Sequence, residues 1–143
     1  MQNQPVMLML GYAGLIPFYA FLLGAWQLRD WPAAISAQGF IIYSLAILCF
    51  LAGTLWGRVQ AVEQPSISRL LVSNGLVLFA VTAILTAKAW LASVALMTAY
   101  LALLWYERET ETLPAWYQSM RRNLTLGAVA AHGLFFVLEA TQP

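Results

Sequence analysis

Short charged patches divide this chain into apolar segments that are each long enough to cross a lipid bilayer. Charge before the C-terminal residues is confined to four patches, at positions 29–30, 58–69, 88 and 107–122. A membrane-spanning helix needs about 20 predominantly apolar residues, and the segments between the patches approach that length. At 62% hydrophobic and 9% charged residues, a chain of 143 residues has too little polar surface for a water-soluble globule. The pattern predicts an all-α fold, an integral membrane bundle of five transmembrane helices in a single domain.

The boundaries of the predicted spans follow from the polar breaks. We expect spans at about 6–27, 34–56, 67–86, 89–106 and 123–138, with an interfacial connector over about 107–122. A continuous helix over 67–106 would be roughly twice the hydrocarbon thickness, so the chain must turn back near Lys88. Pro17 should kink the first span near Gly14, and Ser66 should cap the third.

The distribution of lysine and arginine predicts the orientation. Five of these residues fall on the side of the N-terminus, at positions 58, 69, 108, 121 and 122, and two fall on the opposite side, at positions 29 and 88. Positive charge gathers on the cytoplasmic side of membrane proteins. We therefore expect a multi-pass protein of a bacterial inner membrane, with a cytoplasmic N-terminus and a periplasmic C-terminus.

Composition and motifs exclude several classes of function. The single cysteine, Cys49, cannot form an internal disulfide and is expected to be a small packing residue. A net charge of +1 without a run of like charges gives no reason to expect a nucleic-acid partner. No hydrolase, zinc-protease or nucleotide-binding motif is present in the sequence. We expect no enzymatic activity, no metal and no cofactor.

Polar residues inside the predicted spans are the first candidates for a site. His132, the only histidine, lies near the middle of the fifth span. It can ligate a haem or relay a proton, but no other His, Cys or carboxylate lies at its depth. A neutral ring that faces the bundle interior and hydrogen-bonds within the protein is the simpler expectation. Gln38, Ser73 and Asn74 are expected to join helices by hydrogen bonds.

Further candidates lie toward the ends of the helices. Arg58, beside Trp56, is either a positively charged anchor or the ligand of a lipid phosphate or an anionic substrate. Tyr12 and Trp56 belong to a set of aromatic residues that either lines a ligand pocket or packs in the core and at the interface. Glu107, Glu109 and Glu111 are expected to form a solvated face of the connector.

Two glycines in the second span predict a helix contact. Gly53 and Gly57 are four residues apart and therefore share a face on which another helix can approach closely. We expect the first and second spans to pack against each other there, beside a pocket with Arg58 at its mouth. Replacing both glycines with leucine is then expected to destabilise the bundle.

Three stretches together resemble a known family. They are Gly11-Tyr-Ala-Gly-Leu-Ile-Pro-Phe18, Gly53-Thr-Leu-Trp-Gly57 and the stretch that begins Leu113-Pro-Ala-Trp-Tyr117 and continues through Arg121 to Leu124-Thr125. In this order they are similar to a family of small proteobacterial membrane proteins of unknown function, whose mitochondrial relatives are called transmembrane protein 69. The chain has Leu55 where the family pattern has histidine, so chemistry that depends on that histidine is not expected here. The resemblance implies a membrane fold and no mechanism.

Two functional hypotheses fit these features. The first is a non-enzymatic accessory or assembly partner of other membrane-protein subunits. The second is a binder of lipids or small ligands, or a small transporter, that uses a cavity between helices near Pro17 and the candidate ligand-binding residues Tyr12, Trp56, Arg58 and His132. Membrane lipids are the expected partners in both.

Overall fold

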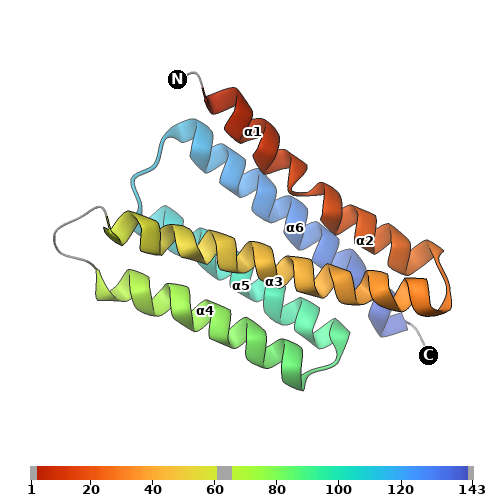
Figure 1. Cartoon of the computed structure of the whole chain (residues 1–143). Helices are drawn as coiled ribbons and strands as arrows, with labels where there is room; N and C mark the ends of the chain where they lie inside the picture. Colours follow the sequence, from red (N-terminus) through yellow and green to blue (C-terminus); the bar gives the residue numbers. More distant parts are fainter. Residues whose placement is uncertain (1–2, 61–65, 142–143) are drawn as a thin grey trace.

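A computed structural model describes residues 3–60 and 66–141 of the chain. In this part the chain forms only helices, joined by short turns (Figure 1). They are α1 (Gln4–Ala13), α2 (Ile16–Gln27), α3 (Asp30–Gln60), α4 (Ile67–Thr86), α5 (Ala89–Thr110) and α6 (Ala115–Thr141). With α1 and α2 taken as one kinked span, five helices are long and apolar enough to cross a membrane. The predicted fold class is confirmed: the protein is an all-helical bundle with five candidate spans.

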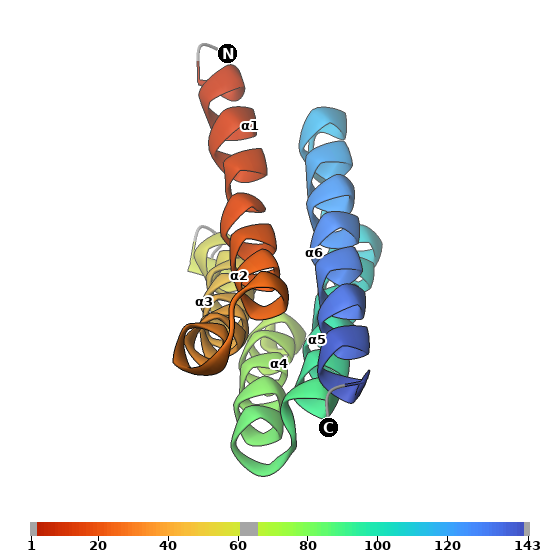
Figure 2. The same ribbon diagram turned by 90° about the vertical axis from the view of Figure 1, so that its right-hand side faces the viewer.

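The spans run alternately up and down, so the two ends of the chain lie at opposite ends of the bundle (Figure 1). Helices α2, α3, α4, α5 and α6 pack each against the next, and α6 returns to α2. Helix α5 also contacts α3, and it is the most buried of the spans. Helix α1 packs against α6 and lies away from α4 (Figure 2). The N-terminal half of the first span is thus the least enclosed part of the bundle.

Several predicted boundaries agree with the structure. Helix α4 covers the predicted span 67–86, and α5 begins at Ala89, directly after the turn at Lys88. Ser66 caps α4, because its side chain accepts a hydrogen bond from the Arg69 amide. The kink is also confirmed: α1 ends at Ala13, three residues before the next helix begins, and the Tyr43 hydroxyl donates to the Gly14 carbonyl at 2.7 Å. That hydrogen bond satisfies a carbonyl at the kink, where the helical pattern of backbone bonds is broken.

The predicted connector 107–122 is mostly helical. Helix α5 continues to Thr110 and α6 begins at Ala115, so four residues separate them. Helix α3 likewise extends beyond the predicted span 34–56 at both ends, and α6 beyond 123–138. Hydropathy indicates only the part of a helix that lies in hydrocarbon. Polar residues at the ends continue the same backbone hydrogen bonds when their side chains are paired, so the helix is longer than the predicted span.

The core lies between α2, α3, α5 and α6. Its fully buried side chains include Phe18 from α2, Phe40 from α3, Tyr100 from α5 and Phe135 from α6. The Phe40 and Phe135 rings stack with centroids 4.4 Å apart, and Phe18 meets Phe40 edge-on. Aromatic interdigitation fixes how these four helices face one another.

The predicted glycine contact between the first and second spans is wrong. A Cβ added to Gly53 or Gly57 would meet nothing within 4 Å, so neither glycine brings another helix close. The close contact between these spans lies further along, where α2 packs on the first half of α3. There a Cβ on Gly39 would lie 2.5 Å from a ring atom of Phe21. The kink after α1 directs the first ten-residue helix toward α6 and away from the end of α3 that carries Gly53 and Gly57.

We expect Gly39→Ala to destabilise the bundle. The new methyl group must displace the Phe21 ring, and such overpacking costs about 1–3 kcal/mol. Gly53→Ala is the matched control, because the added methyl group meets open space and the free energy of unfolding should stay within about 0.5 kcal/mol. Unfolding of both variants in mixed micelles titrated with a denaturing detergent measures the difference. Equal stability of the two variants would contradict the close α2–α3 contact.

Candidate functional site

His132 lies at the centre of a buried polar network. The ring is fully buried, and its Nδ1 and Nε2 lie 2.6 Å from the Ala128 carbonyl oxygen and the Ser44 Oγ. A carbonyl accepts only, so Nδ1 donates and Nε2 accepts the Ser44 hydroxyl proton. This tautomer is assigned from the hydrogen-bond partners. The prediction that His132 faces the interior and hydrogen-bonds within the protein is confirmed.

Two backbone carbonyls extend this network to α5. The Tyr100 hydroxyl donates to the Ser44 carbonyl at 2.7 Å, and the Ser93 hydroxyl donates to the His132 carbonyl at 2.9 Å. Each of the three helices α3, α5 and α6 is thereby joined to the other two by buried hydrogen bonds. Since the imidazole already has a partner at both nitrogens, it has no nitrogen available to ligate a metal.

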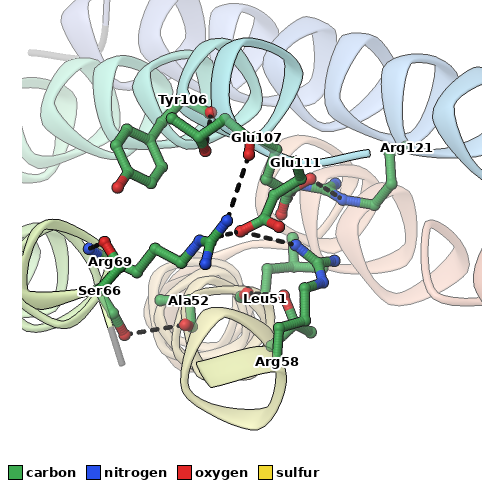
Figure 3. A network of polar contacts seen from close by, with 12 residues as sticks. Leu51, Ala52, Arg58, Ser66, Arg69, Tyr106, Glu107, Glu111 and Arg121 are labelled. Carbon is green, nitrogen blue, oxygen red and sulfur yellow. Dashed lines mark hydrogen bonds and ion pairs between the residues drawn. The ribbon is translucent and has the colours of Figure 1, made fainter. Parts of the chain in front are cut away.

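A second polar network lies at the end of the bundle where α3 ends, α4 begins and α5 turns into α6 (Figure 3). Its most buried pair is Glu107 on α5 with Arg121 on α6, whose side chains are 2% and 3% exposed. The guanidinium is bidentate: Nε and Nη2 donate to the two carboxylate oxygens at 3.0 and 3.3 Å. Its Nη1 donates to Thr125 Oγ1 at 3.3 Å. This arrangement satisfies both charges in a site that excludes solvent.

Glu111 connects three helices at the same end. Its Oε1 lies 2.7 Å from the Arg69 Nε of α4 and 3.9 Å from the Arg58 Nη1 of α3 (Figure 3). Arg69 also donates to the Thr110 carbonyl at 3.3 Å. The Arg58 Nη1 is buried and has no aligned hydrogen-bond partner among the residues that the structure describes. Glu111 Oε1 also lacks an aligned hydrogen-bond partner among these residues, so its contact with Arg58 is an ion pair without a hydrogen bond.

These pairs correct the expectation of a solvated carboxylate face. Glu107 is 1% exposed and Glu111 is largely enclosed, whereas Glu109 alone of the three points outward as expected. Arg121 is also buried, whereas its neighbour Arg122 is exposed. The sequence spacing could have indicated this burial. Residues 107 and 111 are four apart and share one helix face, as do residues 121 and 125.

A groove opens beside this network. It has a volume of about 530 Å³ and lies where α1 diverges from the end of α3 and the α5–α6 turn passes. It is lined by Met7, Thr54, Gly57, Arg58, Leu113, Pro114, Trp116 and Tyr117. A separate, smaller cavity of about 140 Å³ lies between α1, α3 and α6, where Leu10, Phe50 and Leu124 are among its lining residues.

Another groove, of about 450 Å³, lies on the outer face of α3 and α4. It is lined by Cys49, Gly53, Trp56, Ser73, Asn74, Val77 and Leu78. Ser73 joins the two helices as predicted, because its hydroxyl donates to the Ala52 carbonyl at 2.8 Å. Asn74 and Gln38 are exposed instead, and Cys49 is exposed rather than packed in the core.

The four predicted ligand-binding residues do not line one cavity. Trp56 faces the α3–α4 groove, Arg58 lines the groove beside α1, and His132 is enclosed in the core. Tyr12 is 40% exposed on α1 and accepts a hydrogen bond from Asn123 of α6 at 3.2 Å. Ligand binding at these residues stays a prediction, and only Arg58 retains the surroundings expected of it.

Comparison with known proteins places this bundle in a family. A family described as "Protein of unknown function (DUF3429)" matches residues 3–137. The chain belongs to the DUF3429 family. The match reaches from the start of α1 far into α6, so the features of DUF3429 extend over all five candidate spans of this chain. No curated protein and no solved structure matches it.

Proposed function

We propose that this multi-pass membrane protein is a non-enzymatic assembly partner that receives a transmembrane helix of another membrane-protein subunit on the outer face of α3 and α4. The observation that carries the proposal is Asn74. This amide is exposed in the first half of a candidate span, and its side chain makes no hydrogen bond to any other residue in the described part of the chain. A polar group that faces hydrocarbon without a partner costs free energy, and polar residues between membrane helices commonly hydrogen-bond across the contact.

The shape of the same face supports a helix as the occupant. Gly53 has no neighbour within 4 Å of an added Cβ, and Cys49 is a further small residue that lines the groove. Small residues let two helix backbones approach closely, and they are enriched where membrane helices associate. Gly53 of α3 is thus available to a helix outside this chain.

The surroundings of Ser44 and His132 support a non-enzymatic role. A hydroxyl hydrogen-bonded to an imidazole can serve as a nucleophile and its base. Here both residues are fully buried, and neither lines any of the cavities described above. This burial supports a packing role for the pair. The absence of a metal and of a cofactor stays a prediction.

We further propose a bacterial inner membrane with the N-terminus in the cytoplasm and the C-terminus in the periplasm. The five-to-two asymmetry of lysine and arginine supports this orientation. Kinship with transmembrane protein 69 is part of the same proposal and rests on the three motifs quoted above. Reporter fusions after Gln60 and after Thr141 would test the orientation.

Photo-crosslinking tests the proposed helix-receiving face. A photoreactive phenylalanine analogue at Leu78, which is 65% exposed in the α3–α4 groove, should form an adduct with one discrete membrane protein in native membranes. The same analogue at Leu101, 45% exposed on α5, should give lipid adducts only. The protein adduct should disappear in Asn74→Leu, a change that leaves the isolated chain folded because Asn74 is exposed.

Two results would overturn the proposal. Lipid adducts alone at both positions would mean that the α3–α4 face meets the bilayer. An adduct only with a second copy of this chain would make the face a surface for self-association instead of a site for another subunit.

A further inference from the structure

The network at the end of the bundle carries an excess of positive charge. Arg58, Arg69 and Arg121 face Glu107 and Glu111, so three cations meet two anions. Arg121 is fully paired with Glu107, and Arg69 lies within 3 Å of Glu111. The uncompensated charge therefore falls on Arg58, whose Nη1 is 3.9 Å from Glu111 and lacks a hydrogen-bond partner among the described residues. The Arg58 side chain is 23% exposed, and its unpaired guanidinium nitrogen favours an anion with oxygen acceptors.

The surroundings of the groove beside Arg58 suit an amphipathic ligand. Trp116 and Tyr117 line the groove together with Arg58, and aromatic residues of this kind suit the headgroup level of a bilayer. The smaller cavity is separate from this groove and lies deeper, between α1, α3 and α6, where Leu51 and Phe50 are roughly 12 Å from Arg58 along α3 at 1.5 Å per residue. That cavity is lined almost entirely by apolar side chains. A groove with a polar end and a deeper apolar cavity thus lie along one seam between α1 and α3.

We propose that this seam is a binding site for an anionic phospholipid. The phosphodiester of the lipid accepts hydrogen bonds from Arg58, and one acyl chain lies between α1 and α3. A headgroup with a net charge of −1 balances the excess charge of the network, whereas a zwitterionic headgroup adds its own cation and leaves the excess in place. The site does not depend on the helix-receiving face, because Trp56 and Asn74 lie in a different groove.

Native mass spectrometry of the whole chain in detergent micelles tests the site. Phosphatidylglycerol and phosphatidylcholine with identical chains are titrated separately, and glycerol phosphate serves as the soluble phosphate. We expect one phosphatidylglycerol to bind at least tenfold more tightly than phosphatidylcholine, and glycerol phosphate not to bind in the same range. Arg58→Gln should abolish the preference, while Arg122→Gln, an exposed cation at the same end of the bundle, should change it less than twofold.

A second variant tests the groove with all charges in place. Gly57→Leu places a larger side chain in the groove at a position where the Cβ itself meets nothing within 4 Å, and it should also remove the bound lipid. Equal affinity for the two lipids, or equal losses in Arg58→Gln and Arg122→Gln, would overturn the site. Binding of glycerol phosphate as tightly as the lipid would overturn the role of the acyl chain. Unchanged lipid binding in Gly57→Leu would show that the lipid does not occupy this groove.

Discussion

Replacing Glu107 with leucine is expected to destabilise the bundle by about 3–5 kcal/mol. The change leaves the Arg121 guanidinium buried, 3% exposed, without the carboxylate that receives two of its hydrogen bonds. Removing one partner of a buried ion pair costs this much because the other charge stays desolvated and uncompensated. The free energy of unfolding in mixed micelles measures the loss.

Two further variants separate charge from packing. In Glu107→Leu combined with Arg121→Met, most of the loss should be recovered, since apolar residues of similar size often replace a buried pair at little cost. Glu109→Leu, an exposed position on the same helix, should change stability by about 0.5 kcal/mol or less. A loss in Glu107→Leu as small as that in Glu109→Leu would mean that the Glu107–Arg121 pair is hydrated in the protein.

The second large effect is expected at His132. His132→Ala removes a fully buried ring that meets Phe18, Phe40 and Tyr100, and it leaves the Ser44 hydroxyl without its partner. A cavity of this kind with an unsatisfied polar group should cost about 2–4 kcal/mol. Gly133→Ala is the control, because a Cβ at that position meets nothing within 4 Å and stability should be unchanged.

A double-mutant cycle with Ser44→Ala isolates the hydrogen bond. Ser44→Ala alone should cost about 1 kcal/mol, and the two changes together should cost less than their sum by about 0.6 kcal/mol, as found for hydrogen bonds between membrane helices. Strict additivity would show that the 2.6 Å contact between Ser44 and His132 contributes packing but no hydrogen-bond energy.

The features that follow from bilayer physics were predictable from the sequence. A span must be apolar over about 20 residues, so Lys88 could only lie in a turn. Helix α4 ends just before this turn and α5 begins just after it, as that constraint requires. The same reasoning fixed the environment of His132, since an imidazole that faces lipid would leave a nitrogen unsatisfied. Pro17 marked the kink because its ring cannot fit a regular helix.

The ion network and the packing of the glycines were not predictable in the same way. Hydropathy treats Glu107 and Arg121 as polar residues that should leave the membrane interior, whereas each makes the other tolerable once α5 and α6 lie side by side. The glycines present the converse problem. A G-x-x-x-G spacing indicates that a helix can approach closely. Which helix does so depends on the direction that the kink gives to α1.

The Glu107–Arg121 pair also constrains how the chain enters the membrane during synthesis. The carboxylate of α5 emerges 14 positions before the guanidinium that neutralises it, and only the short turn before α6 separates their helices. Helix α5 inserted alone would carry an unpaired charge into a poorly solvated site, whereas α5 and α6 inserted together carry a neutral pair. We therefore expect the last two helices to insert together, as a hairpin whose insertion is completed only when α6 has left the ribosome.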